Sequence, residues 1–248
     1  MTPQPTTSTD RHPGHSTPAG QTPQIGHAAD RKEASTAGDL RAEVAARYRE
    51  VNGAHPMSAG DDDYVDRQFV TLDAVCAGRP ETPEDVRAAM LGGRIPLPSY
   101  LRSDGAEMVP ADLFGLADAA GGTDRLPQWF TRHWPTAEEG AAEWDAYLSG
   151  RYVCLHCVTP ANIQRKTALV TAIEQALSRP QPELTSWLEQ LHAQVDELDA
   201  LEPPFAPDYD RLRFGGPSSR SQCIDDVRDR FPRPSPGSRP TTAERESE

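Results

Sequence analysis

The stretch YVCLHCVTP, residues 152–160, holds the chain's most chemically suggestive residue spacing. Cys154 and Cys157 form a C-x-x-C pair with His156 between them. This pattern occurs in zinc sites and in thiol–disulfide redox motifs. A structural zinc site needs four ligands, however, and the chain's other two cysteines, Cys76 and Cys223, stand alone in separate predicted helices. We therefore predict no metal and no cofactor at this stretch.

The direction of the two thiols depends on the local backbone. If the stretch is extended, Cys154 and Cys157 point to opposite faces, whereas continuation of the preceding helix would place them on one face. A redox motif also needs its first cysteine at a helix N-terminus, where the thiolate is stabilised. The predicted helix cap is Thr159, after both cysteines. We expect the stretch to be a connector that leads into the following helix.

Three consecutive carboxylates, Asp61, Asp62 and Asp63, are a second candidate for chemistry. They follow Ser58, a residue type that caps helices, and acidic residues in the first turn interact favourably with the helix dipole. The alternating ligands, central glycine and final glutamate of a calcium-binding loop are absent from the sequence after them. The pattern therefore predicts a helix start rather than a cation site. Sequence motifs for nucleotide binding, serine hydrolysis or zinc proteolysis are likewise absent.

A glycine-rich loop near the C-terminus suggests an anion site. Gly215 and Gly216 precede a predicted helix that is capped by Ser218 or Ser219, and a helix N-terminus attracts anions. The basic residues near this loop are Arg211, Arg213 and Arg220. The alternative, which we favour, is that Phe214 docks this segment on the core and that the arginines pair with carboxylates of the acidic surface.

Residues 70–110 carry the most regular pattern of short elements. Thr71 and Thr82, the latter followed by a proline, are predicted to open two short helices, and RSDG joins two short extended runs as a hairpin turn. The order of two helices and a hairpin, in the form V-T-L-D, T-P-E-D-V-R and G-R-I-P-L-P, resembles the winged helix-turn-helix of excisionase and MerR-type proteins. This resemblance implies a DNA-binding fold.

If this winged module bound DNA, its second helix would enter the major groove and the hairpin would contact the backbone. The basic residues placed to do so are Arg79, Arg87, Arg94 and Arg102. Glu84 and Asp85, however, occupy the N-terminal end of the second helix, where base-reading residues usually lie. We therefore favour a role of the module in packing or in protein contact.

The rest of the chain predicts helices. Residues 160–178 begin with a proline after Thr159, and residues 184–201 carry apolar side chains in a three–four alternation, so the two should form an antiparallel pair. We predict a mainly α fold, with the winged module and its β-hairpin followed by a bundle-like helical half. The predicted divisions are a disordered tail at 1–38, a helical region at 39–135, a helical C-terminal half at 136–231 and a disordered tail at 232–248.

Composition limits the partners of the protein. The 248 residues carry a formal net charge of −13, which disfavours attraction to nucleic-acid phosphates and to anionic membranes. The basic residues are almost all arginine, since Lys32 and Lys166 are the two lysines, and we interpret this as a coding bias. No run reaches the length of a membrane span and no secretory leader precedes the folded region, so we expect a cytoplasmic protein with reduced thiols.

Four segments read together carry a second resemblance, which runs from about Leu40 to Phe231. They are RYREVNGAHPMSAGDDDYVDRQFVTLDAVCAGRPETPEDVRAAM, GRIPLPSYLRSDGAEMVPADLF, YLSGRYVCLHCVTPANIQRK and RFGGPSSRSQCIDDVR. They resemble an uncharacterised actinobacterial family, domain of unknown function 6058, which is often labelled a natural-product biosynthesis protein. The resemblance implies an association with biosynthetic genes and brings no assigned activity or catalytic residue.

Three functional hypotheses follow from the sequence. The first is a non-enzymatic binding or accessory protein with a protein or small-molecule partner, associated with natural-product biosynthesis. The second is a tailoring enzyme with a site between the two halves, which would require a deep pocket with converging polar groups. The third, disfavoured by charge, is a DNA-binding regulator that acts through the winged module.

Overall fold

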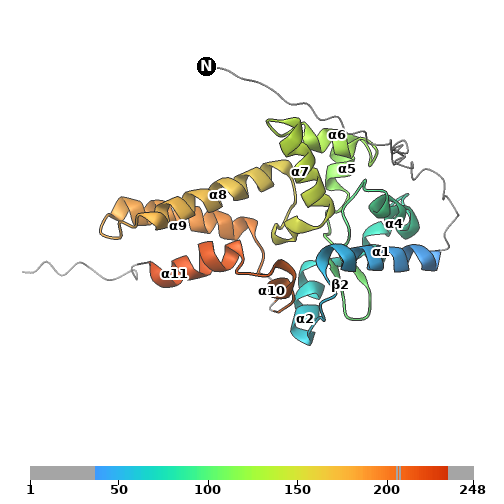
Figure 1. Cartoon of the computed structure of the whole chain (residues 1–248), viewed down its shortest axis with the longest axis horizontal. Helices are drawn as coiled ribbons and strands as arrows, with labels where there is room; N and C mark the ends of the chain where they lie inside the picture. Colours follow the sequence, from blue (N-terminus) through green and yellow to red (C-terminus); the bar gives the residue numbers. More distant parts are fainter. Residues whose placement is uncertain (1–36, 205, 207, 234–248) are drawn as a thin grey trace, which may run out of the picture. The chain divides into compact units, whose positions relative to one another are not determined.

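A computed structural model describes residues 37–204, 206 and 208–233, and these residues are mainly helical with one small antiparallel sheet (Figure 1). The predicted fold class is therefore confirmed. The predicted tails, 1–38 and 232–248, lie almost wholly outside the described residues, although helix α1 already includes Ala37 and Gly38. Within the described residues, no helix combines the length and the apolar character that crossing a bilayer requires.

The first part of the chain holds four helices and all three strands of the sheet. In chain order these are α1 (Ala37–Asn52), α2 (Ala59–Gln68), β1 (Val70–Thr71), α3 (Leu72–Cys76), α4 (Pro83–Leu91), β2 (Tyr100–Leu101) and β3 (Glu107–Val109).

The starts of these helices follow from single capping side chains, as predicted. The hydroxyls of Ser58, Thr71 and Thr82 each accept a hydrogen bond from the backbone N–H three residues further on. The carboxylate of Asp61 completes a capping box by accepting from the backbone N–H and the hydroxyl of Ser58. The consecutive aspartates therefore begin a helix, and the cation alternative finds no support in their geometry.

The sheet contains the predicted hairpin and one strand that the sequence did not reveal. Its strand order is β1-β3-β2, and both pairings are antiparallel. The hairpin turn closes where the N–H of Arg102 donates to the carbonyl of Ala106, and Gly105 takes a positive φ of 79° that favours glycine. The added strand, β1, has only two residues, too few to show an alternating pattern. Helices α3 and α4 lie between β1 and β2 in the sequence, in the predicted order.

The second part of the chain is helical. Its elements are α5 (Gly115–Ala120), α6 (Leu126–Thr131), α7 (Ala137–Leu148), the 3₁₀ turn η1 (Arg151–Cys154), α8 (Pro160–Ser178), α9 (Thr185–Leu201), α10 (Tyr209–Phe214), the π-helical turn η2 (Ser221–Asp225) and α11 (Asp226–Arg230). Helices α8 and α9 lie side by side and are joined by residues 179–184, which confirms the predicted helix pair (Figure 1).

Three clusters of buried apolar side chains hold these elements together. The first extends from Val44 to Ile163 and includes residues of α4, α5, α6 and α7. The second is aromatic and joins Tyr48, Tyr64 and Tyr100 to Tyr209, far along the chain. The third packs α8 and α9 against η2 and α11. The first two clusters each combine residues from both sides of the predicted boundary at residue 135.

One charged pair lies inside the first part of the chain. The guanidinium of Arg87 on α4 donates to both carboxylate oxygens of Glu107 on β3, at 2.6 to 3.0 Å, and these residues are only 5% and 3% exposed. Glu84 on α4 adds an ion pair at 3.1 Å. Removal of one member would leave the other charge buried without its partner, which costs more than the pair contributes to stability.

We predict that Arg87→Met and Glu107→Leu each lower the free energy of unfolding by about 3–5 kcal/mol. The double variant should recover most of this loss, because no unpaired charge then remains inside the protein. Urea denaturation followed by circular dichroism measures the difference. Arg94→Met is the matched control, since Arg94 pairs with the exposed Asp124, and it should change stability by less than about 1 kcal/mol. A double variant no more stable than either single variant would contradict this account.

Candidate functional site

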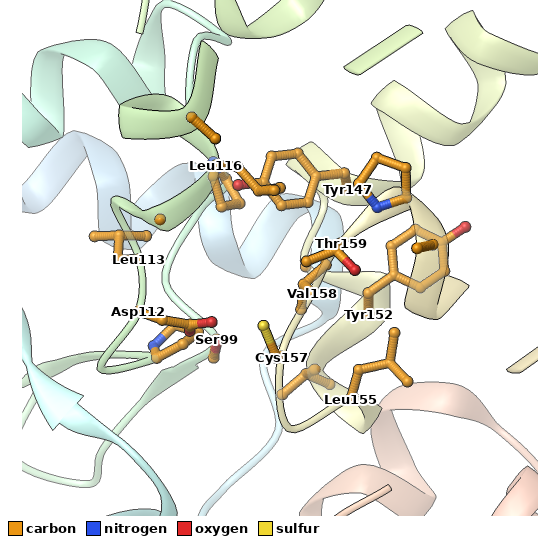
Figure 2. A pocket seen from close by; sticks show the side chains of 18 of the residues that line it. Ser99, Asp112, Leu113, Leu116, Tyr147, Tyr152, Leu155, Cys157, Val158 and Thr159 are labelled. Carbon is orange, nitrogen blue, oxygen red and sulfur yellow. The ribbon is translucent and has the colours of Figure 1, made fainter. Parts of the chain in front are cut away.

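An apolar pocket of about 430 Å³ opens where four stretches of the chain meet (Figure 2). Its walls come from residues 96–99 before β2, residues 110–119 after β3, the aromatic residues of α6 and α7, and residues 150–161. The volume lies in the range of small-molecule sites, and apolar lining with a few polar groups is typical of them. The walls include residues from both sides of residue 135.

The wall formed by residues 150–161 is shaped by one glycine and one helix cap. Gly150 follows α7 with a positive φ of 75°, which turns the chain into η1. Thr159 caps α8 by accepting from the N–H of Asn162, and Pro160 occupies the first helical position. The side-chain amide of Asn162 also donates to the carbonyl of Cys157 at 2.9 Å. The segment between η1 and α8 is therefore fixed at both ends.

Aromatic rings support the pocket from the side of α6 and α7. The ring of Tyr147 stacks on Phe130 with centroids 5.1 Å apart, and Trp144 meets Phe130 edge to face at 5.4 Å. Figure 2 shows the Tyr147 ring reaching toward Leu116 across the pocket. The part of the chain that the structure describes offers the Tyr147 hydroxyl no hydrogen-bond partner, and burial raises the pKa of this group. A neutral hydroxyl is therefore available to a ligand.

Cys157 and Asp112 form the most polar part of the pocket and lie near one another (Figure 2). Loss of solvent around the sulfur and the neighbouring Asp112 carboxylate raise the pKa of Cys157 to about 11. The thiol therefore remains protonated at neutral pH, and a protonated thiol is a poor nucleophile. The described residues supply no histidine hydrogen-bonded to Cys157 that would remove its proton.

Two further side chains bound the pocket. The hydroxyl of Tyr152 donates to Glu143, and burial raises the pKa of this glutamate. The ring of His133 packs on Trp129 with centroids 4.4 Å apart, and its Nδ1 lies 2.7 Å from the Trp129 carbonyl oxygen. Because a carbonyl oxygen only accepts, Nδ1 carries a proton and donates it to this oxygen. The pocket can therefore hold an apolar molecule and offer it a carboxylate, a hydroxyl and a thiol.

The two cysteines of the C-x-x-C pair differ in surroundings. Cys154 is buried and its sulfur contacts Lys166, whereas Cys157 is exposed at the pocket, and both are free thiols. Cys154 belongs to the 3₁₀ turn η1, which ends before Leu155 takes an extended conformation, so α7 does not continue through the pair. Among the residues described, no three His, Cys, Asp or Glu side chains are grouped to hold a metal ion.

The four arginines that would contact DNA if the winged module bound it all have acidic partners. The ion pairs are Arg79 with Glu81 and Asp118, Arg87 with Glu84 and Glu107, Arg94 with Asp124, and Arg102 with Asp66 and Asp104. Arg87 is buried and presents no surface to a phosphate. These pairs compensate the positive charge that a phosphate contact would require, which argues against a nucleic-acid surface at this module.

The three arginines of the candidate anion site also have partners. Arg211 pairs with Asp208 on the surface, and Arg220 pairs with Asp199 and donates to the carbonyl of Glu202. Arg213 binds no carboxylate among the described residues and donates to side-chain and backbone oxygens instead. The expectation that Phe214 docks this segment is wrong, because Phe214 is 43% exposed.

The segment is docked by Arg213 and by its neighbours in α10. The Arg213 guanidinium donates to Asn52 Oδ1 at 2.9 Å, to the carbonyl of Ser99 at 2.9 Å and to the carbonyl of Gly150 at 3.3 Å. It also lies 5.6 Å from the ring centroid of Tyr48. Two of these acceptors, Ser99 and Gly150, belong to residues that line the pocket. Arg213 therefore positions the pocket wall from behind.

Hydroxyl and carboxylate groups around α10 make further hydrogen bonds near Arg213. Asp61 Oδ1 accepts from the N–H groups of Asp208 and Tyr209 at the start of α10, at 3.0 and 3.1 Å. The buried carboxylate of Asp210 accepts from the Tyr100 hydroxyl at 2.8 Å, and burial raises the pKa of Asp210. The start of α10 is thus fixed to α2 and to β2.

The sequence singled out Cys157 but not the residues that surround it. Asp112 and Tyr147 carried no motif, because they reach the pocket from segments 45 and 10 positions away in the chain. The one available signal was the glycine and proline content of residues 92–98, 150 and 160, which marks turns but not what the turns enclose.

Comparison with known proteins identifies one family. Residues 128–232 match the model of a family of unknown function (DUF6058), over fewer than half of the chain's 248 residues. The matched segment includes Trp129, Tyr147 and the wall at 150–161, but not Asp112. No curated protein and no solved structure matches the chain.

We predict that Arg213→Ala lowers the free energy of unfolding by about 2–4 kcal/mol, because three acceptors lose a charged donor. Arg211→Ala is the matched control on the same helix. Its ion pair with Asp208 is exposed, so the control should change stability by less than about 1 kcal/mol. Urea denaturation of the two variants measures both quantities, and equal losses would show that Arg213 has no special role.

We predict that alkylation of Cys157 by iodoacetamide is slow at pH 7 and accelerates about tenfold per pH unit up to pH 10, in proportion to the thiolate fraction. Asp112→Asn removes a negative charge beside the thiol, so it should lower the pKa and raise the rate at pH 8 several-fold. Asp124→Asn, on an exposed residue paired with Arg94, should leave the rate unchanged. Mass spectrometry of the labelled peptides follows each cysteine separately. A rate that levels off below pH 9 would contradict the raised pKa.

Proposed function

We propose that this protein binds a small apolar molecule in the pocket and does not transform it. The observation that carries the proposal is the pocket itself, with about 430 Å³ of space and largely apolar walls. Its polar groups are few, and a small number of polar groups in an apolar cavity orients a ligand. The Asp112 carboxylate favours a ligand with one hydrogen-bond donor or a positive charge.

The absence of an activated nucleophile supports binding over catalysis. Cys157 is the reactive side chain best placed to attack a ligand, and its raised pKa keeps it protonated at neutral pH. Asp112, which in another setting would act as a base, contributes to that rise. The two groups therefore act against nucleophilic chemistry.

The family resemblance narrows the setting of the proposal. A chain related to actinobacterial proteins labelled for natural-product biosynthesis would meet apolar intermediates or products of such a pathway in the cytoplasm. The four free thiols suit a reducing compartment. A binding or accessory role, such as holding one of these molecules, would use the pocket without requiring catalytic groups.

A tailoring enzyme is the second candidate, favoured by one specific observation. The pocket is lined by residues on both sides of residue 135, where the enzyme hypothesis expected a site. Its Tyr147 hydroxyl and Asp112 carboxylate are a donor and an acceptor at the same cavity. Regulation through DNA is a weaker candidate, since acidic partners pair with the arginines of the winged module.

We predict that Ala119→Trp, at the pocket wall, weakens binding of N-phenyl-1-naphthylamine by about tenfold or more, since an indole ring fills part of the cavity. This probe is a neutral apolar fluorophore with a single N–H donor. Ala46→Trp on the exposed side of α1 is the matched control and should bind within about twofold of the unmodified protein. Fluorescence titration gives both dissociation constants, and equal affinities would place the probe outside the pocket.

Native mass spectrometry of protein purified from its own host separates the two candidates. A binding protein should retain one apolar compound per chain, and that compound should remain unchanged after prolonged incubation. Chemical conversion of the retained compound would favour the enzyme instead.

A further inference from the structure

A thiol, an amine and a carboxylate meet beneath the pocket wall, outside the site described above. Lys166 Nζ on α8 lies 2.8 Å from the sulfur of Cys154 and 2.8 Å from Glu202 Oε1. The same carboxylate oxygen accepts from the Ser219 hydroxyl at 2.7 Å, while Glu202 Oε2 is buried and has no partner among the residues that the structure describes. None of the three charged or reactive groups lines the pocket, so a ligand there does not explain them.

The identity of the basic residue is informative in this chain. Its 25 basic residues include only two lysines, and arginine occupies every basic position but Lys166 within the described residues. A guanidinium remains protonated in proteins, whereas an ε-amine can lose its proton and act as a nucleophile. Lys166, beside Cys154, is therefore the basic residue whose side-chain nitrogen can become a nucleophile and bond to an oxidised cysteine.

The contact between nitrogen and sulfur is close. Its 2.8 Å falls within the range of N–H···O hydrogen bonds, although sulfur is a larger atom than oxygen. A single oxygen atom inserted between the two would span about this separation without movement of the backbone. A direct sulfur–nitrogen bond would require the two atoms to come much closer together.

A small oxidant can reach this pair from solvent. Cys154 is 8% exposed and the Lys166 side chain is 17% exposed, so the pair is covered but not sealed. Burial raises the pKa of the Cys154 thiol, and the adjacent Lys166 ammonium opposes the rise. Oxidation should therefore be slow at neutral pH and faster as the pH increases, because the thiolate is the reacting form.

We propose that oxidation by a hydroperoxide joins Cys154 to Lys166 through a bridging oxygen, as a covalent S–O–N crosslink. In the first step one peroxide converts the thiol to a sulfenic acid and releases water. In the second step the sulfenic oxygen bonds to the neutral amine, a second peroxide accepts two electrons, and two waters are released. The crosslinked protein has gained one oxygen atom and lost two hydrogen atoms.

The surrounding groups set the pH at which these steps occur. Against the opposing effect of burial, Cys154 and Glu202 Oε1, the latter 2.8 Å from Nζ, raise the pKa of Lys166, so the nitrogen loses its proton and becomes reactive only as the pH increases. The crosslink would tie η1 to α8 on either side of the segment that carries Cys157.

The test is a tryptic digest of the unmodified protein after treatment with hydrogen peroxide, without a reducing agent. Trypsin does not cleave between Arg179 and Pro180, so it normally releases residues 152–165 and, after cleavage at Lys166, residues 167–211. The crosslink blocks cleavage at Lys166, so residues 152–165 should appear joined to residues 166–211. The joined mass should exceed the sum of the two peptides by about 14 Da, one oxygen minus two hydrogens. A thiol reductant should separate them, and the yield at a fixed time should increase from pH 7 to pH 9.

Two variants test whether the Lys166 amine and the Cys154 sulfur are the groups that become linked. Lys166→Arg keeps the charge and removes the reactive amine, so it should give no joined peptide. Cys157→Ser leaves Cys154 intact and should crosslink as well as the unmodified protein. A joined mass about 2 Da below the sum would indicate a direct sulfur–nitrogen bond and overturn the oxygen bridge. Sulfinic or sulfonic acid at Cys154 with normal cleavage at Lys166, or an unmodified Cys154, would overturn the crosslink itself.

Discussion

The guanidinium of Arg213 joins three parts of the chain that lie far apart in the sequence. It binds Asn52 at the end of α1, Ser99 before β2 and Gly150 after α7, which are 161, 114 and 63 positions away. Because Ser99 and Gly150 also line the pocket, the shape of the candidate site depends on a residue that never touches its ligand. Position 150 also favours glycine. A Cβ there would lie 3.1 Å from the Arg213 guanidinium, and any other residue would have to adopt the positive φ of this position.

Arginine has a structural role in this acidic protein. Arg87 neutralises a buried glutamate, Arg213 saturates buried oxygens, and Arg79, Arg94 and Arg102 pair with surface carboxylates. A planar guanidinium with five donors can bind several acceptors at once, which suits each of these positions. The abundance of arginine that we interpreted as a coding bias is thus also used by the fold, and it makes the single described lysine an exception with chemical meaning.

The sequence predicted features that depend on residues close together in the chain, and it missed features that depend on residues far apart in it. The caps at Ser58, Thr82 and Thr159 depend on atoms three residues away, so a local pattern was sufficient to predict them. The partner of Arg87 lies 20 positions away and the partner of Lys166 lies 36 positions away, and no local pattern encodes such pairs. The pocket likewise forms from four separate stretches of the chain. The wrong prediction that Phe214 is buried also arose because burial depends on residues far away in the sequence. An aromatic side chain predicts burial, but the tertiary packing buried Tyr209 of the same helix instead.

The contact between Asn52 and Arg213 also determines when the fold can be completed in a cell. A ribosome adds about 5–20 residues per second, so roughly ten to thirty seconds separate the synthesis of these two residues. During that interval Tyr48, Tyr64 and Tyr100 lack Tyr209, which closes their cluster in the finished protein. The nascent chain therefore carries an incompletely covered aromatic surface until Tyr209 has been translated and has folded back onto the cluster.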